Sequence, residues 1–94
     1  MQKLHFGHVV QSTKGRDRFR VFIVVGIREN RSGYEAVIAN GALRTLEGAK
    51  VKNPRHLKII AEITDLEKDE LRKALTDENL KKICNKYDNF SKKI

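Results

Sequence analysis

The stretch from Phe19 to Ile27 limits the possible folds more than any other part of the chain. Its apolar side chains recur at every second position, at Phe19, Val21, Ile23, Val25 and Ile27. A spacing of two places side chains on one face of a β-strand. The opposite face begins with Arg18 and Arg20 and ends with Phe22 and Val24, so we expect one end of this strand to be exposed and the other buried.

Four further segments have the features of short strands. They are residues 4–11, 34–39, 42–46 and 56–63, the last with Leu57, Ile59, Ala61 and Ile63 facing inwards. Asn40-Gly41 predicts a hairpin turn between the third and fourth strands, because both residues tolerate a positive φ. Five short strands joined by tight turns favour a mainly β fold, a small antiparallel barrel that is closed or nearly closed.

From Thr64 onwards the period changes to that of a helix. Thr64-Asp65-Leu66-Glu67 is a capping-box pattern, and the helix it opens carries Leu71 and Leu75 on one face. A second helix begins at Thr76-Asp77-Glu78, with an apolar stripe at Leu80, Ile83, Cys84 and Tyr87. We therefore divide the chain into a barrel, residues 1–63, and a tail of two short helices, residues 64–94. The stripe either covers the barrel or docks onto a partner protein through Leu80, Ile83 and Tyr87.

Positive charge is concentrated in the predicted barrel. The chain has a net charge of +8, and residues 1–63 hold 12 Lys and Arg against 5 Asp and Glu, whereas residues 64–94 hold 8 against 7. Such an excess indicates an anionic partner. The alternative is a surface whose charge serves solubility alone.

The connection between the first two predicted strands is the most basic segment. Lys14, Arg16, Arg18 and Arg20 recur at every second residue, which in an extended or hairpin segment lines one side of the chain and suits a row of phosphates. Gly15 permits a positive φ and a close backbone approach. We expect Asp17 to order this loop by pairing with a neighbouring amide or arginine.

Two blocks of sequence resemble the KOW domain family, whose members are SH3-like barrels of ribosomal proteins and transcription elongation factors. The first block is Gly7-His8-Val9-Val10, Gly15-Arg16-Asp17 and the strand Val21 to Val25; the second is residues 39–46, Lys50-Val51-Lys52 and His56-Leu57. The similarity is strongest to the KOW barrels of eukaryotic and archaeal large-subunit ribosomal proteins and to short bacterial KOW-domain RNA-binding proteins. Phe19 replaces the glycine that the family has two residues after the aspartate.

The resemblance implies an SH3-like barrel that binds structured RNA, often ribosomal, through the loop between its first two strands. The expected RNA-binding residues are those of that loop and of a second basic cluster: Lys14, Gly15, Arg16, Arg18, Arg20, Arg44, Lys50, Lys52 and Arg55. In a five-strand meander the loop at 12–18 and the Asn40-Gly41 turn project from one end, and residues 47–55 from the other. Arg44 is therefore expected to be a better companion of the loop than Lys50.

Other classes of function have little support in the sequence. There is no glycine-rich nucleotide loop and no paired-carboxylate pattern, so we expect a binding protein without catalytic residues or a cofactor. His5 and His8 lie three residues apart, on opposite faces of a strand, and no metal site is expected from them. Lacking a long apolar run or a secretion signal, the chain is predicted to be cytoplasmic. The resemblance to the KOW family implies association with the ribosome or another ribonucleoprotein. The alternative function is a protein-interaction module that docks its tail onto a translation or transcription component.

Overall fold

Five antiparallel strands and two C-terminal helices make up the fold. The computed structural model describes the backbone of residues 3–91 and the side chains of residues 3–87. The strands are β1 (His8–Ser12), β2 (Val21–Asn30), β3 (Gly33–Ala39), β4 (Lys50–Lys52) and β5 (Leu57–Glu62), with the short 3₁₀ helix η1 (Pro54–His56) before β5. The helices are α1 (Asp65–Lys73) and α2 (Asp77–Ser91).

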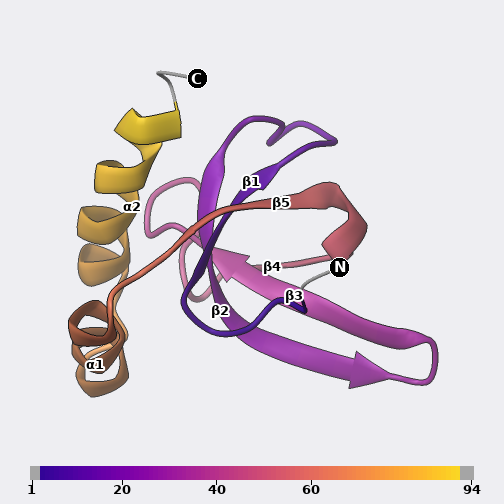
Figure 1. The fold of residues 1–94 in the computed structure, drawn as a ribbon, viewed down its shortest axis with the longest axis horizontal. Helices are drawn as coiled ribbons and strands as arrows, with labels where there is room; N and C mark the ends of the chain where they lie inside the picture. Colours follow the sequence, from indigo (N-terminus) through magenta and orange to yellow (C-terminus); the bar gives the residue numbers. More distant parts are fainter. Residues whose placement is uncertain (1–2, 92–94) are drawn as a thin grey trace.

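The strands form one sheet in the order β4-β3-β2-β1-β5 (Figure 1). All the neighbouring pairs are antiparallel, including β1 with β5, which brings the first and last strands together. β4 and β5 are the two edge strands, and η1 connects them. The mainly β, five-stranded antiparallel architecture is therefore confirmed, while closure into a barrel stays a prediction.

Strand β2 changes face partway along its length. Val21 and Ile23 pack on the side of the sheet that the helices cover, whereas Phe22 and Val24 pack on the other side. A register shift between Val24 and Gly26 inserts an extra residue opposite β3, so Ile27 joins Phe22 and Val24. A bulge of this kind reverses the alternation, and the prediction that all five apolar residues from 19 to 27 share one face is wrong.

The last strand is divided by a similar irregularity. Its pairing with β1 shifts between Val9 and Val10. Leu57 and Ile59 accordingly belong to the core on the side away from the helices, and Ala61 and Ile63 to the core beneath them. The predicted inward set of residues 57, 59, 61 and 63 is therefore split between two cores.

The segment predicted as the fourth strand is an irregular loop. Asn40 Oδ1 accepts hydrogen bonds from the amides of Ala42 (3.1 Å) and Arg44 (2.9 Å), and the carbonyl of Arg44 accepts from the amides of Asn40 (2.9 Å) and Gly41 (3.0 Å). These local hydrogen bonds occupy backbone groups that a strand over 42–46 would need for pairing with a neighbouring strand. The strand that pairs with β3 comes later, at Lys50–Lys52, so Asn40-Gly41 is not a two-residue hairpin.

Both helices pack on one face of the sheet (Figure 1). Thr64 caps α1 with a complete capping box, as predicted: its Oγ1 accepts from the amide of Glu67 (3.1 Å), and Glu67 Oε1 accepts from the amide of Thr64 (2.9 Å). Leu71, Leu80, Ile83 and Cys84 are buried against Val9, Val21 and Ile23. Leu75, predicted to share the face of Leu71, lies beyond the end of α1 and is exposed.

The covering role of the tail decides between the two predicted roles of its stripe. Leu80 is fully buried, Ile83 is nearly so, and Tyr87 is half-buried with its hydroxyl donating to Glu67 Oε1 at 3.2 Å. The prediction that Leu80 and Ile83 present a docking surface is therefore wrong, because they pack against the chain's own sheet. Within the described residues, neither helix has the length and apolar character needed to cross a membrane.

Candidate nucleic-acid interface

The loop between β1 and β2, residues 13–20, projects from the upper edge of the sheet in Figure 1. Its two ends are held together by backbone hydrogen bonds, from the amide of Ser12 to the carbonyl of Arg20 (3.0 Å) and from the amide of Phe19 to the carbonyl of Ser12 (2.8 Å). Between them the chain makes two overlapping turns. The amide of Arg18 donates to the carbonyl of Gly15 (3.2 Å), and that of Arg20 donates to the carbonyl of Asp17 (2.9 Å). The basic residues thus lie on a tightly turned loop between two paired strands.

Asp17 is the buried centre of this loop. Its side chain is 3 % exposed; Oδ1 accepts from Lys52 Nζ (2.7 Å) and from the Ser12 hydroxyl (2.9 Å), and Oδ2 accepts from Lys50 Nζ (3.2 Å). Burial raises the pKa of this carboxyl, but the hydrogen bonds from Lys52, Ser12 and Lys50 outweigh burial and hold the pKa at about 2. Asp17 orders the loop as predicted, but through two lysines of β4 in place of a neighbouring amide or arginine.

Lys52 has a structural position. Its side chain is 7 % exposed, and its ammonium group donates to Ser12 Oγ, to Asp17 Oδ1 and to the carbonyl of Lys14 (2.8 Å). An ammonium group has three protons to donate, so these contacts use all of them. Lys50 is 33 % exposed and reaches the same carboxylate from the outside. The expectation that these two lysines project from the end opposite the loop is therefore wrong, because β4 runs beneath the loop.

The four cations of the loop differ from Lys52 in being exposed. Lys14, Arg16, Arg18 and Arg20 all lie at the surface, and no carboxylate among the described side chains comes within ion-pairing distance of them. The loop's own carboxylate is turned inwards and neutralised by β4. The four charges are consequently available to an external anion.

The remaining predicted residues flank the loop on two sides. Arg55 is exposed on η1 and lines the same pocket as Thr13 and Lys58, next to the hydrogen bond from the Thr13 amide to the His56 carbonyl (2.9 Å). On the other side, Arg20 shares a pocket with Asn40 and Leu43. Arg44 is half-buried, and its Nε finds no acceptor among the described residues.

Phe19 is a feature of the loop that the sequence did not reveal. Counted as the first core residue of a strand, it lies instead in the second turn with φ = 72° and is 64 % exposed. The Arg18 guanidinium lies over its ring, 4.6 Å from the centroid. The available signal was its position, immediately after a turn and between two arginines.

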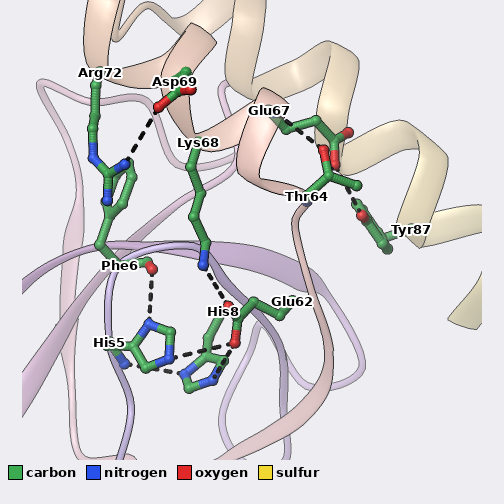
Figure 2. A network of polar contacts seen from close by, with 10 residues as sticks. All are labelled: His5, Phe6, His8, Glu62, Thr64, Glu67, Lys68, Asp69, Arg72 and Tyr87. Carbon is green, nitrogen blue, oxygen red and sulfur yellow. Dashed lines mark hydrogen bonds and ion pairs between the residues drawn. The ribbon is translucent and has the colours of Figure 1, made fainter.

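His5 and His8 lie side by side, contrary to the prediction of opposite faces. The amide of His8 donates to the carbonyl of His5 (3.1 Å), and Gly7 in this turn has φ = 94°, so His5 does not belong to the strand. The centroids of the two rings are 3.8 Å apart, and the Nε2 atom of each ring lies 3.4 Å from Glu62 Oε1 (Figure 2). The glycine in third place of His5-Phe6-Gly7-His8 was the signal for this turn.

Hydrogen bonds assign the protons in this cluster. His8 Nδ1 accepts from the amide of His5 (3.1 Å), so its proton is on Nε2, facing Glu62. His5 Nδ1 donates to the carbonyl of Phe6 (2.9 Å). The ligand atoms of His5, His8 and Glu62 lie within 4.8 Å of one another. However, the proton on His8 Nε2 leaves at most two ligands for a metal in this arrangement, the carboxylate and, when its ring is neutral, His5 Nε2, which is fewer than zinc sites take from protein.

The cluster joins His5 and Phe6 to α1. Lys68 donates to Glu62 Oε2, and the Arg72 guanidinium lies 5.4 Å from the centroid of the Phe6 ring (Figure 2). Burial lowers the pKa of His8, and the charge of His5 adds to this effect. The hydrogen bond from Lys68 lowers the pKa of Glu62. These contacts fasten the tail to the sheet, on a different element from the basic loop.

No protein-family model and no curated protein sequence matches the chain.

Proposed function

We propose that this chain is an RNA-binding protein that uses the loop at residues 13–20 to contact the phosphates of a structured RNA. The observation that carries the proposal is the arrangement of charge in the loop. Its one carboxylate, on Asp17, is buried and paired with β4, while Lys14, Arg16, Arg18 and Arg20 are exposed and unpaired among the described side chains. Guanidinium groups donate two parallel hydrogen bonds to a phosphate, which suits them to this role.

Two further features support the proposal. The charge excess lies in residues 1–63, the part that contains the loop. The sequence blocks that resemble the KOW family include the loop, and the family binds RNA with its equivalent segment. On this basis we also propose an SH3-like KOW barrel, a binding protein without catalysis, located in the cytoplasm on a ribosome or another ribonucleoprotein. Outside the loop, Arg55 is the predicted residue best placed to contact the same RNA, because it is exposed and close to Thr13 at the start of the loop.

The alternative function, a module that docks through the tail, has less support. Leu80 and Ile83 are buried against the sheet, so they reach a partner only if α2 detaches.

Ultraviolet cross-linking in cells, followed by sequencing of the attached RNA, tests the proposal. We expect the parent protein to yield discrete RNA sites, and the triple variant Arg16→Ala, Arg18→Ala, Arg20→Ala to lose most of that signal. A matched control removes three exposed lysines from the tail: Lys73→Ala, Lys81→Ala, Lys82→Ala. Equal loss in both variants would mean that net charge alone, and not this loop, attracts RNA. Absence of RNA from the parent protein would contradict the proposal.

A further inference from the structure

Phe19 is the most unusual residue on the basic loop. It is one of four large apolar side chains that the described chain exposes, and it is 64 % exposed. Exposing an aromatic ring forgoes the stabilisation that its burial would give. Val21, two residues later and at the start of β2, is buried. If the strand extended back to Phe19, its ring would point to the same side as Val21 and could be buried in the core there.

The backbone at Phe19 is also held in an unfavourable conformation. Phe19 occupies the third position of the turn closed by the Arg20 amide and the Asp17 carbonyl, with φ = 72°. This position of a turn calls for glycine or asparagine, because a Cβ collides with the backbone when φ is positive. Hydrogen bonds fix the conformation on both sides: the Phe19 amide donates to Ser12, and its carbonyl accepts from Gln11 Nε2 (3.2 Å). The strain is thus built into the loop, and strained, exposed residues of this kind are found at binding sites.

The surroundings of the ring indicate what it contacts. Arg18 lies over the ring, and the flanking Arg16 and Arg20 are exposed. Single-stranded nucleic acid is bound by this combination, in which cations hold the backbone and an aromatic face stacks on a base. Uninterrupted duplex RNA offers no free base face, because its bases are stacked on one another.

We propose that Phe19, with Arg18, is a stacking platform for an unpaired base, so that the loop selects RNA whose bases are free, as in loops, bulges and single strands. This inference rests on the proposed function, since it requires that the loop meets RNA. It adds a preference that charge alone does not give. Phosphates are present in every RNA, whereas a base face is available only where pairing is interrupted.

The first test compares Phe19→Ala and Phe19→Tyr on a single-stranded RNA and on a duplex of the same length. We expect Phe19→Ala to weaken single-strand binding by about 5- to 150-fold, to leave duplex binding and the salt slope nearly unchanged, and Phe19→Tyr to retain parental affinity. Phe19→Gly separates binding from folding, because it removes the ring and relieves the positive φ. Its thermal unfolding midpoint should not fall, while its single-strand affinity falls as in Phe19→Ala.

A second measurement reports stacking directly. The chain has no tryptophan, so Phe19→Trp places its single tryptophan at the proposed contact. We expect single-stranded RNA to quench this tryptophan, and inorganic polyphosphate, which has the charge but no bases, to bind without quenching. Parental binding to RNA combined with unchanged affinity of Phe19→Ala, or equal quenching by RNA and polyphosphate, would overturn the inference and leave the proposed function standing. A parent protein that binds no RNA would overturn the proposed function itself.

Discussion

At the scale of single residues, two lysines of one strand have different roles. Lys50 and Lys52 both reach Asp17, but Lys52 is 7 % exposed and donates three hydrogen bonds, whereas Lys50 is 33 % exposed and donates one. Their spacing in sequence is the same as that of two solvated lysines on one strand face. Only the position of the loop above β4 distinguishes them, and that position depends on pairing across more than thirty residues.

Replacing Lys52 should therefore destabilise the fold far more than replacing Lys50. Lys52→Met leaves a buried carboxylate without its principal partner, which costs about 3 kcal/mol or more of unfolding free energy. Lys50→Met removes a partner that is itself partly exposed and leaves Lys52 paired with Asp17, which costs less than about 1 kcal/mol. Urea denaturation of the two variants measures the difference. Equal, small losses would show that the buried pair does not hold the loop.

His8 gives the fold a dependence on pH near neutrality. Burial lowers its pKa from the ordinary 6.5, so the unfolded chain takes up a proton at a higher pH than the folded chain. The contribution of neutral His8 to the free energy of unfolding is therefore complete above about pH 6.5, and it is lost as the pH falls through the pKa of His8 in the folded protein.

We expect the free energy of unfolding to decrease between pH 7.5 and pH 5, and His8→Asn to remove most of that decrease. Asparagine does not titrate, and its side-chain oxygen keeps an acceptor near the position of Nδ1. Denaturant titrations of both proteins across this range measure the effect. The same pH dependence in both proteins would assign it to another group.

At the scale of elements, Gly41 controls how closely α2 approaches the sheet. It has φ = 78°, and a Cβ placed there would lie 2.1 Å from the carbonyl oxygen of Asp77 and 2.8 Å from the amide nitrogen of Lys81. Asp77 also accepts a hydrogen bond from the amide of Leu46 (2.7 Å) through its side chain. The loop of residues 40–49 thus seats the first turn of α2.

Gly41→Ala should accordingly displace α2 and destabilise the protein. Backbone strain and the collision with helix backbone together cost about 3 kcal/mol. Gly33→Ala is the matched control, because Gly33 also has a positive φ (139°) but no atom beyond its two chain neighbours lies within 4 Å of its added Cβ. Thermal unfolding of the two variants separates strain from collision. A loss at Gly41 no larger than at Gly33 would contradict the close contact.

How far the elements could be predicted depends on whether their signals are local. The helices and the capping box at Thr64 follow from residues within one or two turns, and they were predicted correctly. The bulges near Gly26 and between Val9 and Val10 arise from pairing with distant strands, so alternation alone placed Ile27 on the wrong face. The side chain of Asn40 accepts hydrogen bonds from backbone amides of the loop that follows it. The dipeptide Asn-Gly does not by itself distinguish such a loop from a two-residue hairpin.

The candidate site was predicted in part for the same reason. The exposed cations of the loop are visible as a local run in the sequence. The roles of Asp17, Lys52 and Phe19 depend on how the loop folds over β4, and no spacing rule gives that.

At the scale of the whole molecule, structural and binding charges are separated. The tail covers one face of the sheet with Leu71, Leu80 and Ile83, and its acidic and basic residues nearly balance. The loop carries exposed positive charge at the edge of the sheet, with its carboxylate buried. Binding through this loop should be electrostatic, and therefore dependent on salt.

The salt dependence of RNA affinity tests the central claim most directly. If the loop neutralises about four phosphates of a single-stranded RNA, the slope of log affinity against log salt concentration should be roughly −3. Changing Arg16, Arg18 and Arg20 together to alanine should flatten it by roughly two units in a protein that remains folded. The tail variant that lacks Lys73, Lys81 and Lys82 should keep the parental slope. A triple-arginine variant with parental affinity and parental slope would contradict the assignment of RNA binding to this loop.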